Sequence, residues 1–230
     1  MRIGIIGAMH EEIIELKQEM KIEEEKNIGG FSFFVGELRD KKIVLVESGI
    51  GKVNSAVCAT ILLQAFKVKE VYFTGVAGAV GRTLNIGDIV VSSSLIEHDF
   101  DCTAFGMEHG MIPRMEESIF KADKELVELA KKATIKVLGE HRCKTGIIVS
   151  GDQFVAAKEK IEWLGATFDA QCTEMEGASV AHVCYLFQIP FVVIRAISDK
   201  ADGSAHMDFK EFVELAAQNS KNIILEMLSK

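Results

Sequence analysis

Acidic side chains stand at several points where a predicted strand gives way to a turn or a helix. They are Glu11, Glu12, Glu174, Glu176 and Asp199. Open α/β sheets bind their ligands beyond the carboxyl ends of their strands, which is where most of these positions fall. Carboxyl groups held there can donate a proton, accept one or stabilise positive charge during a reaction. The sequence therefore predicts an acid–base site assembled from distant parts of the chain.

The first pair of acids also has a simpler explanation. Negative side chains are favoured in the first turn of a helix, so Glu11 and Glu12 could serve only the helix that follows the first strand. Neighbouring helical positions point about 100° apart, so at most one of the two is expected to face a cleft.

The remaining acids have different surroundings in the sequence. Glu174 and Glu176 flank Met175, and in extended backbone both acids would lie on the side opposite to Met175. Asp199 ends a strongly apolar segment whose other charged residue is Arg195. For Asp199, a chemical role and a structural role are about equally compatible with this pattern.

Alternating strand and helix patterns must position these acids. The predicted strands are 2–6, 31–38, 42–47, 71–74, 88–92, 144–150 and 191–197, with the second and third forming a hairpin. The predicted helices are 11–20, 53–66, 121–137, 156–164, 177–187 and 208–228, and residues 101–115 form a long loop. This order predicts one α/β domain over residues 1–230, with a central mixed β-sheet flanked by helices.

Composition excludes several classes of partner. The 230 residues include 34 acidic and 26 basic side chains, a net charge of −8 that disfavours nucleic acids and anionic membranes. The 5 cysteines form no CxxC motif, which favours reduced thiols in the cytoplasm. The start of the chain does not resemble a signal peptide, and Pro190 divides the longest uncharged run, so we expect no membrane span.

Familiar cofactor motifs fail on inspection. Residues 48–52 resemble a phosphate loop, but Val46 and Val53 stand where a Walker A motif needs Gly and Ser or Thr. The glycine-rich residues 75–81 do not have the GxGxxG spacing of a dinucleotide site. Ile14 stands where an HExxH zinc motif would need its second histidine. Nucleotide hydrolysis, dinucleotide binding and zinc-dependent hydrolysis are therefore disfavoured.

Taken together, the motifs resemble the bacterial 5′-methylthioadenosine/S-adenosylhomocysteine nucleosidases of the nucleoside phosphorylase superfamily, from end to end. The resemblance rests on residues 4–9 with Glu11 and Glu12, 48–53, Thr74 and Gly75 with Ala77 and Gly78, 87–92, Asp101 with 103–106, 150–152 with Phe154, 174–176, and 195–199 with Ala201 and Asp202. It implies hydrolysis of the N-glycosidic bond of 5′-thio-substituted adenosines, giving adenine and a thioribose, in a nucleoside phosphorylase-like fold without metal or organic cofactor. Such a reaction suits carboxyl groups, because the purine must gain a proton while water attacks a cationic sugar.

The resemblance also implies roles for the acids. Asp199 would protonate N7 of adenine, and burial by the preceding apolar segment would raise its pKa to suit that role. Glu12 would orient and deprotonate the water, Glu176 would accept hydrogen bonds from the ribose hydroxyls, and Arg195 would help to hold the water and the acids.

The same resemblance implies a substrate pocket. Phe154 would stack on the purine, Val155 would contact its edge, Gly78 would allow close approach of the backbone, and Met175 would lie against the sugar. Ser198 would frame the loop that carries the acid Asp199. The pocket for the 5′-alkylthio group would be lined by Met9, Ile50 and Phe209. Without the resemblance, ordinary core packing would explain the apolar members of this set. Val76 departs from the family pattern, which often has Ser there, so we expect a modest loss of rate or affinity.

The family is typically homodimeric, with a neighbouring subunit closing the 5′ pocket. The corresponding residues here are Cys102, Phe105 and Pro113 in the long loop. This gives a reason for the length of that loop, since long loops in compact domains are often functional.

Other functions stay open at this stage. A phosphorylase would use phosphate instead of water, but Met9, His10 and Val76 stand where basic residues would be wanted, and Glu12 would repel the phosphate. A nucleoside-binding protein without activity is a second alternative, and an NAD-dependent oxidoreductase is a third. The sequence does not distinguish among methylthioadenosine, S-adenosylhomocysteine, 5′-deoxyadenosine and 6-amino-6-deoxyfutalosine as substrates.

Overall fold

The computed structural model describes residues 1–200 and 205–229, and between 205 and 211 it describes the helix without its side chains. The strands are β1 (Arg2–Gly7), β2 (Lys21–Ile28), β3 (Phe31–Leu38), β4 (Lys41–Glu47), β5 (Glu70–Ala79), β6 (Ile89–Glu97), β7 (Phe120–Lys121), β8 (Cys143–Ser150), β9 (Ala170–Glu174) and β10 (Phe191–Asp199). The α-helices are α1 (His10–Glu19), α2 (Lys52–Phe66), α3 (Lys124–Leu138), α4 (Lys158–Phe168), α5 (Gly177–Phe187) and α6 (Ala205–Leu228).

These strands form one mixed sheet that closes partly on itself. Its order is β10-β6-β8-β9-β5-β1-β4-β3-β2, with β7 beside β6 and a further pairing of β10 with β5. The strands β5, β10, β6, β8 and β9 therefore form a closed ring, and β1, β4, β3 and β2 extend from it as an open arm. The length of β5 allows this, because its first part pairs with β1 and its last residues, Gly78 and Ala79, pair with β9.

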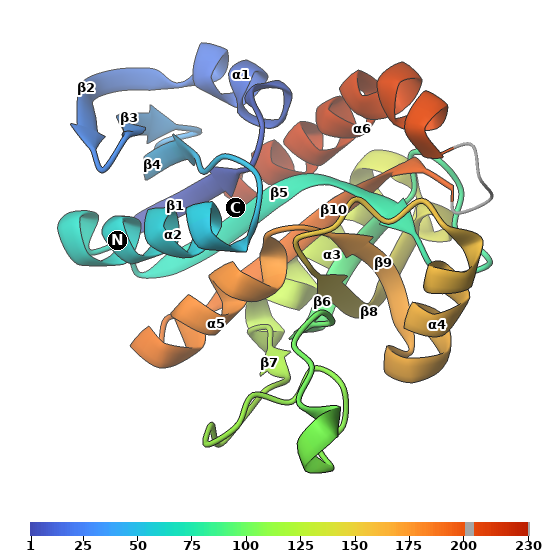
Figure 1. The fold of residues 1–230 in the computed structure, drawn as a ribbon. Coiled ribbons are helices and arrows are strands. Elements are labelled where there is room, and N and C mark those ends of the chain that lie inside the picture. Colours follow the sequence, from blue (N-terminus) through green and yellow to red (C-terminus); the bar gives the residue numbers. More distant parts are fainter. Residues whose placement is uncertain (201–204, 230) are drawn as a thin grey trace.

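Helices cover the sheet on opposite faces (Figure 1). One buried cluster joins α1, α3 and α6 to the strands, and includes Ile5 and Leu45. A second cluster joins α2 and α5 to the other face, and includes Ile6 and Val46. Neighbouring strand residues enter opposite clusters because side chains alternate along a strand. Helix α4 packs against β8 and β9 in a third, smaller cluster.

The α/β class with a central mixed sheet and flanking helices is confirmed, and so is the hairpin, which is β3 and β4. The strands β2, β7 and β9 were not predicted. The predicted strand 71–74 ends too early, because β5 continues to Ala79 and pairs with β10 and β9 there. The predicted start of the third helix is also too early, since Asp123 caps α3 by accepting hydrogen bonds from the backbone of Glu125 and Leu126.

Residues 98–119 connect β6 to β7 and project from the body of the molecule (Figure 1). They contain a short 3₁₀ turn at Thr103–Phe105, and otherwise have the irregular structure predicted for 101–115. Among the helices in the described ranges, we find none with the length and apolar character needed to cross a membrane.

Candidate active site

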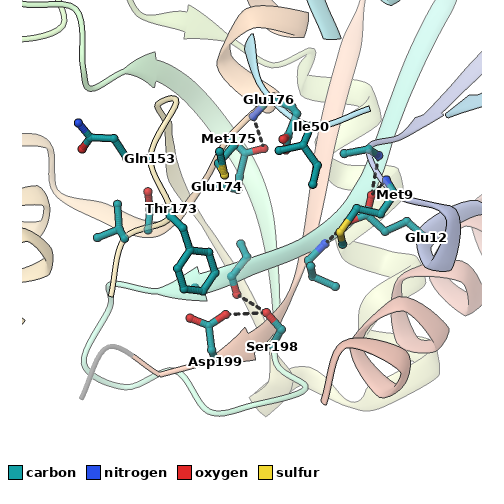
Figure 2. A pocket seen from close by; sticks show the side chains of 16 residues that line it. Met9, Glu12, Ile50, Gln153, Thr173, Glu174, Met175, Glu176, Ser198 and Asp199 are labelled. Atoms are coloured by element: carbon teal, nitrogen blue, oxygen red, sulfur yellow. Dashed lines mark hydrogen bonds between the residues drawn. The ribbon is translucent and has the colours of Figure 1, made fainter. Parts of the chain in front are cut away.

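A cavity of about 360 Å³ opens at the carboxyl ends of several strands. Segments that follow β1, β4 and β8 line it, together with the last parts of β5, β9 and β10. The residues predicted from the sequence that line this cavity are Met9, Glu12, Ile50, Val76, Gly78, Phe154, Val155, Met175, Glu176, Ser198 and Asp199. Figure 2 shows Glu12 and Asp199 on different sides of the cavity, with Met175, Glu176 and Ile50 together along another side.

Glu12 lies in the first turn of α1 and is only 4% exposed, whereas Glu11 is exposed. Its Oε2 accepts hydrogen bonds from the backbone of Ala8 at 2.5 Å and Met9 at 3.0 Å, and its Oε1 accepts one from Val76 at 2.9 Å. Burial raises the pKa of Glu12, although the charge of Arg195 and the three backbone bonds oppose the rise. A fixed carboxyl group with a raised pKa suits a general base.

Arg195 lies behind the cavity and is almost completely buried. Its Nη2 donates to Glu174 Oε2 at 2.5 Å and lies 4.0 Å from Glu176 Oε2, while its guanidinium stacks 4.0 Å from the centre of the Phe73 ring. Burial alone would lower the pKa of Arg195, but the neighbouring carboxylates outweigh burial and raise it. Arg195 is therefore a permanent positive charge among the buried acids.

Gly75 leaves room for both Glu12 and Arg195 beside the β5 backbone. A Cβ atom at this position would overlap both Glu12 Oε1 and Arg195 Nη1. Only glycine leaves this space to the two side chains, so Gly75 contributes to the site by having no side chain of its own.

Glu176 occupies the N-cap position of α5 and is buried beside the other acids. Its Oε1 accepts a hydrogen bond from the backbone of Gly51 at 2.9 Å. Burial and then the charge of Glu174 raise the pKa of Glu176 to about 8, although Arg195 and the bond from Gly51 oppose the rise.

Glu174 was not assigned a role from the sequence, yet it joins several parts of the site. Its Oε2 accepts bonds from Arg195 and from the backbone of Glu176 at 3.1 Å and Gly177 at 2.7 Å, and its Oε1 accepts one from the hydroxyl of Ser150. The prediction that both acids lie opposite Met175 is wrong: the backbone bends after Glu174, and all three residues line the cavity.

Asp199 ends β10 and is 4% exposed. The hydroxyl of Ser198 donates to its Oδ1 at 2.7 Å (Figure 2). A Cβ atom on Gly78 would lie 2.8 Å from Asp199 Oδ2, so glycine leaves room for the carboxyl group at this point of β5. Asp199 is thus held at the cavity by the two neighbouring strands β5 and β10.

The remaining predicted residues lie elsewhere. Cys102, Phe105 and Pro113 are in the projecting segment 98–119 and do not line the cavity of their own chain; Phe105 is 85% exposed. The side chain of Phe209 lies outside the described residues. Glu174, one of the acids expected at the strand ends, lines the cavity as well, and the lining residues that were not predicted are Ala8, Ala77, Gln153 and Thr173. Ala8, Ala77 and Gln153 each directly adjoin a residue predicted for the substrate pocket, so adjacency in the chain could have indicated them.

Known proteins are similar to this chain along its whole length. The model of the phosphorylase superfamily matches residues 2–229. A 5′-methylthioadenosine/S-adenosylhomocysteine nucleosidase of Actinobacillus succinogenes is 45% identical, with 100% of this chain and 99% of that protein covered.

Two solved structures are similar in fold as well as in sequence. The nucleosidase of the same name from Neisseria meningitidis, in complex with methylthio-immucillin-A, has a TM-score of 0.95 and 39% identity over 99% of this chain and 98% of that one. A futalosine hydrolase of Helicobacter pylori has a TM-score of 0.92 and 41% identity over 98% of this chain and 96% of that one.

Proposed function

The chain belongs to the phosphorylase superfamily, and from this premise we propose that it hydrolyses the N-glycosidic bond of 5′-methylthioadenosine and S-adenosylhomocysteine. The products are adenine and the corresponding thioribose, and 5′-deoxyadenosine is a further expected substrate. The relatives named as nucleosidases, at up to 45% identity over the whole chain, support this substrate class. The observation that carries the mechanism is a pair of buried carboxyl groups, Glu12 and Asp199, on different sides of one cavity.

In this mechanism Asp199 gives a proton to N7 of adenine as the bond between C1′ and N9 breaks and its electron pair moves to the purine. Water adds to C1′ from the other face of the sugar, and Glu12 accepts a proton from it. Arg195 Nη1 has no hydrogen-bond partner within the described part of the chain and can help to orient that water. The buried acids also stabilise the positive charge that develops on the sugar.

The other cavity residues bind the nucleoside. Glu176 accepts hydrogen bonds from the ribose hydroxyls, while Met175 lies against the sugar and Phe154 stacks on the purine. Val155 contacts the edge of the purine, and Gly78 lets the backbone approach the substrate closely. Ser198 frames the loop that carries Asp199. The 5′-alkylthio group lies against Met9 and Ile50, as the family resemblance implies for these positions and for Phe209. Val76 contributes its backbone amide, which holds Glu12.

We expect water rather than phosphate as the attacking group, because the Glu12 carboxylate already occupies the place where backbone N–H groups would bind a phosphate. The backbone N–H groups of Ala8, Met9 and Val76 all point to its carboxylate, and helix N-termini such as that of α1 are where phosphate would otherwise bind. Among the described residues that line the cavity there is no lysine or arginine. A phosphate dianion would therefore meet a negative charge where it needs donors.

We also propose that a second copy of the chain completes the site. Val53 and Val57 lie one helical turn apart on α2 and are exposed, shortly after the exposed Ile50 of the cavity. Phe105, in the projecting segment, is a further exposed apolar side chain. In a homodimer, Cys102, Phe105 and Pro113 of one subunit would close the 5′ pocket of the other. Light scattering after size-exclusion chromatography should give the mass of a dimer; a monomer at micromolar concentration would contradict this part.

The same function suggests a cellular setting. Release of adenine and methylthioribose belongs to methionine salvage and amino-acid biosynthesis, which we place in the cytoplasm. The free thiols Cys58, Cys102, Cys143, Cys172 and Cys184 are consistent with a reducing compartment.

The decisive experiment follows adenine release from 5′-methylthioadenosine in phosphate-free buffer and again with phosphate, with the sugar product identified by mass. Hydrolysis gives methylthioribose in both buffers. A sugar 1-phosphate formed only with phosphate would instead identify a phosphorylase, and the absence of release from all four candidate nucleosides would favour a binding protein. The panel includes 6-amino-6-deoxyfutalosine because a futalosine hydrolase is among the similar structures.

A further inference from the structure

Two walls of the cavity come from strands that are not neighbours in the sheet. The first wall segment, residues 48–52, follows β4 and contributes Ile50; the second wall segment, residues 151–155, follows β8 and contributes Phe154 and Val155. No strand pairing between β4 and β8 fixes the separation of these segments within the described sheet. Something else must hold them at the distance that a nucleoside needs.

Three residues join the two wall segments in a closed ring of hydrogen bonds. The backbone N–H of Lys52 donates to Asp152 Oδ1 at 2.8 Å. The backbone N–H of Asp152 donates to Asp99 Oδ2 at 3.0 Å, and the ammonium of Lys52 donates to Asp99 Oδ1 at 2.6 Å. Asp99 lies just beyond β6, so the ring ties both walls to the base of segment 98–119.

The electrostatic surroundings of Asp99 and Lys52 favour the charged form of both side chains in the ring. Burial alone would raise the pKa of Asp99, but the bonds from Lys52 and from the Asp152 backbone outweigh burial and lower it. Burial alone would lower the pKa of Lys52, but Asp99 and Glu97 outweigh burial and raise it. Both side chains are therefore charged at neutral pH. Both side chains are largely shielded from water. An ion pair in such a position is screened less than one at the surface.

We propose that Asp99 is a positioning residue for the nucleosidase reaction, because it fixes the distance between the walls that hold the purine and the 5′ group. The proposal rests on the function inferred above. The ring also adjoins the sugar site, since Gly51, next to Lys52, donates to Glu176. Glu12 and Asp199 lie on α1 and β10 and are held by other bonds. Loss of the ring should therefore weaken substrate binding more than it slows the chemical step.

The first test replaces Asp99. In Asp99→Ala and in Asp99→Asn, the KM for 5′-methylthioadenosine should rise between about tenfold and a hundredfold, while kcat changes by less than about threefold. Asparagine should not rescue the site, because both oxygens of Asp99 accept bonds and an amide must turn its NH₂ group towards one of the two donors.

The second test uses the different chemistry of Asp152, which contributes one oxygen to the ring. Asp152→Ala should raise KM in the same way, but Asp152→Asn keeps an acceptor for the Lys52 N–H and should restore most of the binding. This contrast between the two asparagine variants is specific to the ring. It also decides the question if an Asp99 variant fails to fold.

Asp123→Ala is the matched control, because Asp123 also accepts two backbone N–H bonds but caps α3 outside the cavity. It should lower the melting temperature and leave KM and kcat unchanged. Unchanged KM in the Asp99 variants, or equal damage from Asp152→Asn and Asp152→Ala, would overturn the proposal. If instead the unaltered protein releases no adenine, the proposed function fails, and the role of Asp99 in that reaction fails with it.

Discussion

The two sides of the cavity are built in different ways. On the acid–base side, Glu12 and Asp199 are each 4% exposed and held by hydrogen bonds from neighbouring residues. On the binding side, Ile50 and Phe154 are 53% and 52% exposed and lie on segments that follow strands. The groups assigned to the chemistry are thus preorganised within one chain, whereas the binding surface is proposed to depend on the ring around Asp99 and on a second subunit.

The largest expected effect is on the acid–base side, in Asp199→Asn. An amide cannot deliver a proton to the purine, so kcat should fall by roughly 10²- to 10⁴-fold. The fold should persist, because asparagine keeps an acceptor for the Ser198 hydroxyl. Adenine release and circular dichroism check both parts, and near-normal turnover would remove the acid role from Asp199.

Glu12→Gln should be the next most damaging change, with kcat lowered by about 10²-fold or more. An amide cannot accept the proton of water, and its NH₂ group would face at least one of the backbone donors that now bind the carboxylate. Turnover is measured together with the melting temperature. If activity survived in a stable variant, another group would have to activate the water.

On the binding side, Phe154→Ala should raise KM by roughly tenfold, as expected for the loss of one stacked base, with kcat nearly unchanged. Leu215→Ala is a suitable control, because Leu215 is another exposed apolar side chain outside the cavity. A fall in kcat without a change in KM would contradict the division between the two sides.

The smallest expected effect concerns stability and pH. The pKa of Glu176 is about 8 in the folded protein and near 4.5 when unperturbed, so the folded state keeps a proton that the unfolded state releases. The free energy of unfolding should therefore fall as pH rises between these values, because the unfolded state loses that proton more readily than the folded state. Denaturant titrations of the protein and of Glu176→Gln should show a shallower fall in the variant; equal slopes would contradict the assignment.

Regular apolar patterns allowed most of the fold to be predicted, but not the closure of the sheet. The strand β2 has a charged, exposed sequence that its own composition does not mark as a strand, and it is ordered by pairing with β3 at the sheet edge. The short β9 depends on partners on both sides. Such tertiary pairings override local preference and leave little trace in the sequence.

The candidate site shows the same division. Helix geometry alone indicated that only one of Glu11 and Glu12 would face a cleft, and this is what the structure has. The part taken by Glu174 could not be predicted, because it arises from contacts with Ser150 and Arg195, which are distant in sequence. Asp99 and Lys52 were missed for the same reason, because their contacts with each other and with Asp152 join segments that are distant in sequence.

The space that Gly75 leaves to Glu12 and Arg195 limits how this sequence can vary. Any replacement of Gly75 introduces an atom into space that both charged groups already fill, so selection for activity should permit glycine alone there. Gly165, within α4, is the opposite case, because an added Cβ would meet only Val80 at ordinary contact distance. Alanine is the better helix former, so random drift should exchange that glycine freely while the other stays fixed.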